Sequence, residues 1–196
     1  MVRLSTSLAF LSLERVKILF FPMEISENIF LGELSFEQTE SYFQIVQDNR
    51  TYFRQWLSWV DTCSTVEGTV SLIEGMLEEE RERIALRLTL LAGYQAIGGI
   101  WVYSIDWEVK SCKLGYWVVP KYQGRGLITL GCEKVISLLF KRMGMQYIMI
   151  ECSLENIRSQ LIAQRLGFFK NKVLKNNEWL YDHYIDHIQY LKIYVA

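Results

Sequence analysis

A short loop with two glycines, residues 121–128, constrains the fold of this chain more than any other segment. It follows an apolar segment typical of a buried strand, and it precedes a stretch whose apolar residues recur at helical spacing. The sequence therefore predicts a strand, a tight loop and a helix in direct succession. At such a junction free backbone N–H groups and the helix dipole converge, and they favour the binding of an anion such as phosphate.

The residues of the loop fit an anion site better than they fit other glycine motifs. Gly124 and Gly126 have no β-carbon to stop the backbone closing around a ligand, and Arg125 adds positive charge. A Walker loop is excluded, since no Gly-Lys-Ser/Thr follows. Thr129 stands where a dinucleotide fingerprint has its third glycine. Taken alone, however, Gly-Arg-Gly is also typical of an ordinary turn.

Seven segments have the apolar or β-branched content of strands, and three of them follow one another closely enough to predict an antiparallel meander. They are residues 25–34, 84–91, 97–105, 113–119, 147–154, 168–174 and 184–194. The run 147–154 is apolar almost throughout, as in a central strand covered on both faces. Since a helix precedes it, the order predicts a parallel crossover. We expect Asn176 and Asn177 to join the last two strands.

About four helices are predicted, each with its own start or stop signal. The helix after the glycine loop should run to about Met143. The other signals are the capping-box pairs Ser35/Gln38 and Ser64/Glu67, the N-cap residue Asn156 and the helix stop Gly167.

Composition bounds the class of protein. The chain has 196 residues, 51% of them hydrophobic, which is enough for one domain with a sizeable core. Its formal charge is −1 with both signs intermixed, so neither nucleic acid nor a membrane surface is an expected partner. The four cysteines lie far apart without clustered histidines, so we expect reduced thiols, no metal and a cytoplasmic protein.

Residues 1–22 are interpreted as an N-terminal extension to which the sequence assigns no role, and residues 23–196 as a single domain. The apolar stretches of the extension are interrupted by Glu14, Arg15 and Lys17, so they are too short to span a bilayer. No small-residue cleavage site follows, as a signal peptide would require. We expect the extension to be dispensable.

The loop and the residues after it resemble the GNAT superfamily of N-acetyltransferases. Asn156, Ser159, Gly167 and Phe168 have the spacing N-x-x-S-x-x-x-x-x-x-x-G-F. Within that superfamily, three segments look like the branch that acetylates the N-terminal amines of ribosomal proteins, namely residues 56–61, 105–107 and 114–117. The resemblance runs from about residue 23 to the C-terminus.

The resemblance implies an α/β (α+β) GNAT fold with a mixed, mostly antiparallel, seven-stranded sheet. Its fourth and fifth strands would splay apart to admit the pantetheine arm of acetyl-CoA, the co-substrate. Backbone groups of Trp117, Val118 and Val119 would bond the pantetheine amides. The loop from Gln123 to Ile128 would hold the pyrophosphate, and Asn156 would touch the pantetheine arm while also capping a helix. The implied residues are Trp117, Val118, Val119, Gln123, Gly124, Arg125, Gly126, Leu127, Ile128 and Asn156.

Proton transfer has two candidate residues. Ala163 stands where many relatives place a tyrosine that protonates the leaving thiolate, which leaves Ser159 as the candidate acid or as a helix-start residue only. Glu151 is the candidate base, because an ionised group in a covered strand is costly without a role or a partner. Its position resembles that of the base in some N-terminal acetyltransferases. Pairing with an arginine or a wet part of the strand is the alternative.

The expected reaction is acetyl transfer from acetyl-CoA to a primary amine. An α-amine has a pKa of roughly 7.7–8.0 against about 10.4 for lysine, so it needs less help to lose its proton. The N-terminus of a ribosomal protein is the favoured acceptor, with Trp56, Trp59 and Trp107 as candidate walls of its pocket. Two alternatives stay open: a small-amine (polyamine, amino sugar or antibiotic) acetyltransferase, and a non-catalytic acyl-CoA-binding domain. The resemblance also implies a homodimer.

Two histidines, His183 and His187, are four residues apart near the C-terminus. Because the region reads as a strand, this spacing does not put both on one helical face for metal binding. Each is interpreted as a surface or hydrogen-bonding residue.

Overall fold

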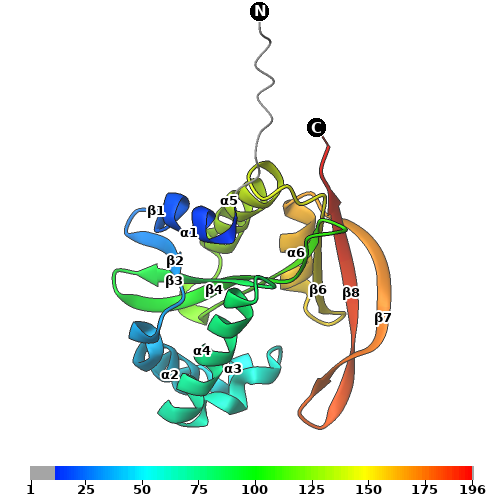
Figure 1. Cartoon of the computed structure of the whole chain (residues 1–196). Coiled ribbons are helices and arrows are strands. Elements are labelled where there is room, and N and C mark those ends of the chain that lie inside the picture. Colours follow the sequence, from blue (N-terminus) through cyan, green and yellow to red (C-terminus); the bar gives the residue numbers. More distant parts are fainter. Residues whose placement is uncertain (1–11, 196) are drawn as a thin grey trace, which may run out of the picture.

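The computed structural model describes residues 12–195, which form an eight-stranded sheet with helices on both faces (Figure 1). The strand order is β1-β2-β3-β4-β5-β6-β8-β7, and within these residues β5 and β6 alone pair in parallel. The strands are β1 (Met23–Ser26), β2 (Ile29–Glu33), β3 (Leu86–Ala92), β4 (Gln95–Asp106), β5 (Ser111–Val118), β6 (Tyr147–Ser153), β7 (Phe169–Leu180) and β8 (His183–Ile193).

The helices lie on both sides of the sheet, with α2, α3 and α4 on one side and α5 on the other (Figure 1). In residues 12–195 no helix is long and apolar enough to cross a membrane. The helices are α1 (Leu13–Phe20), α2 (Thr39–Asp48), α3 (Arg50–Phe53), α4 (Val66–Arg81), α5 (Leu127–Lys141) and α6 (Ile157–Arg165), with the 3₁₀ helices η1 (Phe36–Gln38), η2 (Ser58–Ser64) and η3 (Pro120–Tyr122).

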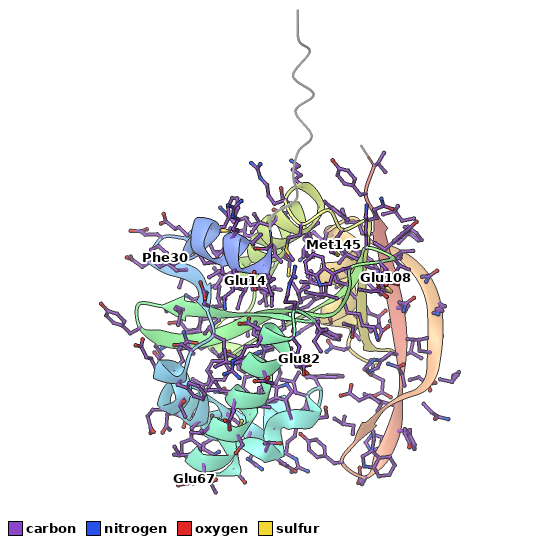
Figure 2. The ribbon with its side chains drawn as sticks, viewed as in Figure 1. Glu14, Phe30, Glu67, Glu82, Glu108 and Met145 are labelled. Carbon is purple, nitrogen blue, oxygen red and sulfur yellow. The ribbon has the colours of Figure 1, made fainter. Side chains whose placement is uncertain are left out.

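The core fills both spaces between the sheet and its helices (Figure 2). On the α5 side the backbone of α5 comes close to β4, because a β-carbon on Gly131 would lie only 2.5 Å from Ile100 Cδ1. On the other side α4 turns an apolar face inward, while Glu67 and Glu82 mark its two ends (Figure 2). The central strands are therefore covered on both faces, as their apolar sequences predict.

The mixed, mostly antiparallel sheet is confirmed, but it has eight strands where seven were predicted. The difference lies in residues 25–34, which read as one apolar strand. Asn28 takes a positive φ of 60° and turns the chain, so that β1 and β2 pair as an antiparallel hairpin. Asparagine tolerates this left-handed conformation, and a turn of this kind needs no glycine.

The helix signals were accurate after the glycine loop and less accurate before it. Asn156 Oδ1 accepts a hydrogen bond from the Ser159 amide at 3.1 Å, which confirms the predicted N-cap of α6. Gly167 has a φ of 77°, as the predicted helix stop requires. The cap of α4 was predicted one residue early, since Thr65 Oγ1 accepts from Gly68 N at 3.0 Å.

Two further local predictions were wrong. Ser35 makes no side-chain cap bond, and η1 separates it from α2. Asn176 and Asn177 do not join the last two strands but lie inside β7, where the register with β8 shifts. The chain reverses later, at Tyr181, which has a φ of 63°.

Helix α1, within the predicted extension, belongs to the hydrophobic core. Leu13 is 2% exposed and Val16 is fully buried. Lys17 Nζ forms ion pairs with Glu80 at 2.8 Å and with Glu33 at 3.0 Å. Because Glu80 is itself buried, removal of Lys17 would leave a buried carboxylate without its cation. This packing argues that α1 stabilises the domain. Residues 1–11 of the predicted extension lie outside the described residues, and their dispensability stays a prediction.

The double substitution Leu13→Ala/Val16→Ala should lower the free energy of unfolding by roughly 3–6 kcal/mol, because each truncation leaves a cavity where apolar contacts were. Urea denaturation measures the change. Arg15→Ala is the matched control, since Arg15 is exposed on the same helix and its loss should change stability by no more than about 0.5 kcal/mol. A double variant as stable as the wild type would show that α1 is peripheral after all.

Candidate functional site

The glycine loop forms an open N-terminus for α5. Gly124 and Gly126 have φ values of 74° and 75°, a left-handed conformation that glycine adopts without strain. Gly126 is the N-cap residue of α5, and no side chain caps the helix. A β-carbon on either glycine would meet no atom of residues 12–195 within 4 Å. The free N–H groups of the first turn of α5 therefore face open space, as an anion site requires.

Strands β5 and β6 splay apart directly before this loop. They pair only from Ser111 to Lys113 in β5 and from Tyr147 to Met149 in β6. Beyond this point both strands continue, β5 to Val118 and β6 to Ser153, without pairing to each other. One edge of β5 is thereby left free for a ligand that adds hydrogen bonds to a strand.

The register of β5 decides which of its peptide groups face the gap. Val119 N donates to Ile97 O at 2.9 Å and is used within the sheet. Because successive peptide groups of a strand point to opposite edges, Trp117 faces β4 as well, and Val118 faces the gap. Of the three residues whose backbone groups were predicted to bond the pantetheine amides, Val118 is placed to do so, whereas Trp117 and Val119 direct theirs to β4.

A cavity of about 1370 Å³ runs through the gap and reaches both faces of the sheet. This exceeds the ~300–1,000 Å³ of usual ligand pockets, so it has room for two substrates. Val119, Arg125 and Trp107 are not among its lining residues. The predicted residues that do line it are Trp56, Trp59, Trp117, Val118, Gln123, Gly124, Gly126, Leu127, Ile128, Glu151, Asn156 and Ser159.

The two faces of the cavity differ in chemistry because side chains alternate along β5. Tyr116 points toward α6 and its hydroxyl donates to Ser159 O at 2.9 Å. Trp117 points the other way, and its ring packs edge-on against Phe53 of α3 at a centroid distance of 5.3 Å. We call the first the α6 face and the second the α3 face.

Tryptophan rings line the α3 face. Trp59 contacts the rings of Trp101 and Trp117 at centroid distances of 5.4 and 5.6 Å, so it serves the core as well as the cavity. Trp107 lies elsewhere, and its indole N–H donates to Arg83 O at 2.8 Å. The structure therefore brings Trp56 and Trp59 to the cavity but not Trp107.

Glu151 lies on the α3 face with both carboxylate oxygens occupied. Lys113 Nζ lies 2.9 Å from Oε2, and Gln189 Nε2 donates to Oε1 at 2.8 Å. Burial acts to raise the pKa of Glu151, but these hydrogen bonds and the Lys113 charge outweigh it and hold the pKa below its usual value. The Glu151 carboxylate is thus ionised at neutral pH. It is paired with Lys113, whereas an arginine was the partner considered from the sequence.

A second carboxylate, Glu178, faces the same cavity and was missed by the sequence reasoning. His187 Nε2 lies 3.3 Å from its Oε2, and Ser58 Oγ donates to its Oε1 at 2.6 Å. The hydrogen bond from His187 is the main cause that lowers the pKa of Glu178. Its side chain is 32% exposed against 6% for Glu151, so Glu178 is the more accessible carboxylate.

His187 has the hydrogen-bonding role that was predicted for it. Asn177 Nδ2 lies 3.0 Å from Nδ1, which fits an amide donor and leaves the proton on Nε2, toward Glu178. One pattern in β8 could have pointed to the residues around Glu178 and Glu151, namely the alternation of polar and apolar residues from 187 to 190. His187 and Gln189 are buried polar residues that alternate with the apolar Ile188 and Tyr190.

The mouth of the cavity near the glycine loop contains another residue that was missed. Arg158, in the first turn of α6, donates to Gln123 Oε1 at 2.8 Å, and Gln123 Nε2 donates to the Tyr52 hydroxyl at 2.6 Å. Arg158 lines the cavity, and its positive charge lies beside the open end of α5. It is a further candidate to contact an anionic ligand.

Comparison with known proteins places the chain in a family. Residues 28–169 match the acetyltransferase (GNAT) domain, and the chain belongs to this family. It is therefore an acyltransferase, as the motifs predicted. The family assignment agrees with the splayed strands and the open glycine loop described above.

The relatives found include ribosomal-protein-serine acetyltransferase of Escherichia coli, 25% identical over 171 residues that cover 87% of this chain and 96% of that protein. The microcin C7 self-immunity acetyltransferase MccE, solved with acetyl-CoA and AMP, has a TM-score of 0.83 at 24% identity and covers 91% of this chain and 99% of its own. The ribosomal L7/L12 acetyltransferase RimL, solved with coenzyme A, has a TM-score of 0.81 at 21% identity, with coverages of 87% and 96%. These structures share the fold.

Proposed function

We propose that this acyltransferase moves the acetyl group of acetyl-CoA to the N-terminal α-amine of a protein, with a ribosomal protein as the favoured acceptor. The observation that carries the proposal is the cavity through the splayed sheet, which is lined by the open N-terminus of α5 and, on its α3 face, by the carboxylates of Glu151 and Glu178. The name of the Escherichia coli relative supports the acceptor class. Such an enzyme would work in the cytoplasm, and the family resemblance favours a homodimer.

The donor would lie along the glycine loop and the free edge of β5. Its pyrophosphate would accept hydrogen bonds from the first turn of α5, next to the positive charge of Arg158. Val118 would bond the pantetheine amides, and Asn156 would contact the arm while it caps α6. This arrangement would bring the thioester into the gap between β5 and β6.

The acceptor amine would approach from the α3 face. Both carboxylates there have a lowered pKa, so they are ionised at neutral pH and attract an ammonium group. Glu178 is the better placed of the two to accept its proton, directly or through a water, because its side chain is the more exposed to the cavity, 32% against 6% for Glu151. The free amine then attacks the thioester carbonyl.

The leaving thiolate would be released toward the α6 face. Ser159 Oγ lines the cavity there, and Ala163 is fully buried in α6 without a hydroxyl to offer. Ser159 is therefore the proposed donor of a proton to the sulfur. Overall, the amine nitrogen loses a proton, the N–C bond forms, the C–S bond breaks and CoA leaves as the thiol.

Thiol release from acetyl-CoA tests the proposal with a panel of acceptors. Short peptides with free N-terminal serine or alanine should support release, and mass spectrometry should place the acetyl group on the α-amine. The matched control is the same peptide with a blocked N-terminus and a free lysine, which should react far more slowly at neutral pH because its amine stays protonated.

Two results would contradict the proposal. Release with a polyamine, amino sugar or antibiotic but with no peptide would identify a small-amine acetyltransferase. CoA binding without release for any acceptor would identify a binding domain.

A further inference from the structure

The hydroxyl of Tyr116 meets Ser159 through two contacts. Tyr116 Oη donates to Ser159 O at 2.9 Å, and Ser159 Oγ donates to Tyr116 Oη at 3.2 Å. Tyr116 comes from β5 and Ser159 from the first turn of α6, so the contact joins one strand of the splayed pair to the helix that follows the other strand. Both residues line the cavity on its α6 face.

The geometry gives the phenol a choice of two acceptors on one residue. Its hydrogen now points to the carbonyl oxygen of Ser159, but Oγ lies only 0.3 Å farther away (3.2 against 2.9 Å). A rotation about the C–O bond of Tyr116 would redirect the hydrogen to Oγ. Ser159 would then be free to turn its own hydrogen away from Tyr116 and into the cavity.

We propose that Tyr116 is a positioning residue that orients the Ser159 hydroxyl toward the departing sulfur of CoA. The inference rests on the proposed function and deepens it. In the resting state Ser159 Oγ–H points to Tyr116. As the C–S bond breaks, the Ser159 hydrogen turns to the sulfur, and the Tyr116 hydrogen turns to Ser159 Oγ.

The proton balance of this step is simple. The S–H bond forms as the Ser159 O–H bond breaks, while Tyr116 Oη donates a hydrogen bond to Oγ and keeps its own proton. Oγ then recovers a proton from solvent water. The proton that the amine nitrogen releases on the α3 face restores the balance. Burial raises the pKa of Tyr116 strongly, so the phenol is neutral and keeps its hydrogen available as a donor at every working pH.

The contact between Tyr116 and Ser159 also supplies a phenol near α6, which position 163 lacks because Ala163 stands where many relatives place a tyrosine. A side chain at position 163 belongs to the buried side of α6, and here it has no hydroxyl. Tyr116 of β5 brings a phenol to α6 at Ser159, which lies one helical turn nearer the N-terminus of α6 than Ala163 does. The phenol is therefore retained beside the sulfur site, but it acts through Ser159.

The test is Tyr116→Phe, which keeps the ring and removes Oη. Single-turnover acetyl transfer should slow about tenfold or more, while CoA affinity stays within about twofold. Ser159→Ala should slow the same step, and the double variant should be no slower than the slower single variant, because both changes remove one unit. Thermal unfolding of each variant confirms that it is folded.

Tyr190→Phe is the matched control. The Tyr190 hydroxyl also joins the sheet to α6, through Gln160 at 3.3 Å and Gln164 at 3.1 Å, but it does not contact Ser159. If Tyr116 only clamped α6 to the sheet, both variants would lose stability alike and neither would slow the chemical step. We expect the transfer rate of Tyr190→Phe to equal that of the wild type.

Three outcomes overturn the inference: a Tyr116→Phe rate within twofold of the wild type, effects of the two single variants that multiply in the double variant, or an unchanged rate in Ser159→Ala. The last applies even if Tyr116→Phe does not fold, since Ser159→Ala leaves the bond from Tyr116 to the backbone intact. The wild-type enzyme is assayed first. Absence of transfer there contradicts the proposed function, whereas transfer that is insensitive to these variants contradicts only the role of Tyr116.

Discussion

Gly126→Val should weaken CoA binding about a hundredfold, which corresponds to ~2.8 kcal/mol at 1.4 kcal/mol per tenfold change. Gly126 caps α5 in a left-handed conformation, and the space beside it is open. A valine side chain would occupy this space and push the pyrophosphate away from the first-turn N–H groups, each of which contributes roughly 1.5–3 kcal/mol to a charged acceptor. Isothermal titration calorimetry with CoA measures the loss.

The matched control for this variant is Gly93→Val. Gly93 has a φ of 61°, and a β-carbon there also meets nothing within 4 Å, so valine causes comparable backbone strain. Gly93 lies in the turn between β3 and β4, outside the cavity lining. Both variants should lose similar stability, but only Gly126→Val should lose CoA affinity. Equal CoA affinity in the two variants would remove the glycine loop as the pyrophosphate site.

The sequence predicted the part of the fold in which local signals and long-range packing agree. The glycine loop, the apolar strand at residues 147–154 and the Asn156 cap each depend on residues close together in the chain. The β1–β2 turn was missed because Asn28 lies between apolar residues on both sides, and no glycine or proline stands at the turn itself. Asn176 was predicted to lie in the turn between the last two strands, but it lies where the register of β7 shifts. A β-bulge uses the same left-handed conformation as a turn, so an asparagine does not distinguish the two.

The acceptor side of the site was harder to predict because its contacts are distant in sequence. Ser58 and Glu178 are 120 residues apart, and they meet only because the β7–β8 hairpin reaches the start of η2. Tyr181 strengthens this contact by donating to Leu57 O at 2.5 Å. The register shift in β7 decides which side chains of the hairpin face the cavity, and no pattern within the strand specifies that shift. The donor side, in contrast, depends mainly on the continuous segment 118–128, to which the start of α6 adds Asn156 and Arg158.

Glu178→Gln should lower kcat/KM about a hundredfold at pH 7, within the ~10²–10⁴ range of general base catalysis, with little change in CoA affinity. Glutamine keeps the shape of the side chain but cannot accept a proton from the acceptor ammonium. Glu151→Gln is the matched control, since it makes the same change in the same cavity at the more deeply buried of the two carboxylates. We expect it to slow turnover less. A larger loss in Glu151→Gln would instead support Glu151 as the base.

The pH dependence distinguishes a base from a structural carboxylate. The pKa of Glu178 is below the ordinary glutamate value, so the group is ionised from acid to alkaline assay pH and does not itself titrate there. The group that titrates is the acceptor amine, with a pKa of roughly 7.7–8.0. Below this pKa the ammonium needs a proton acceptor, and above it the amine is already free. The defect of Glu178→Gln should therefore shrink between pH 7 and pH 9, whereas a defect of constant size across that range would assign Glu178 to the structure of the β7–β8 hairpin.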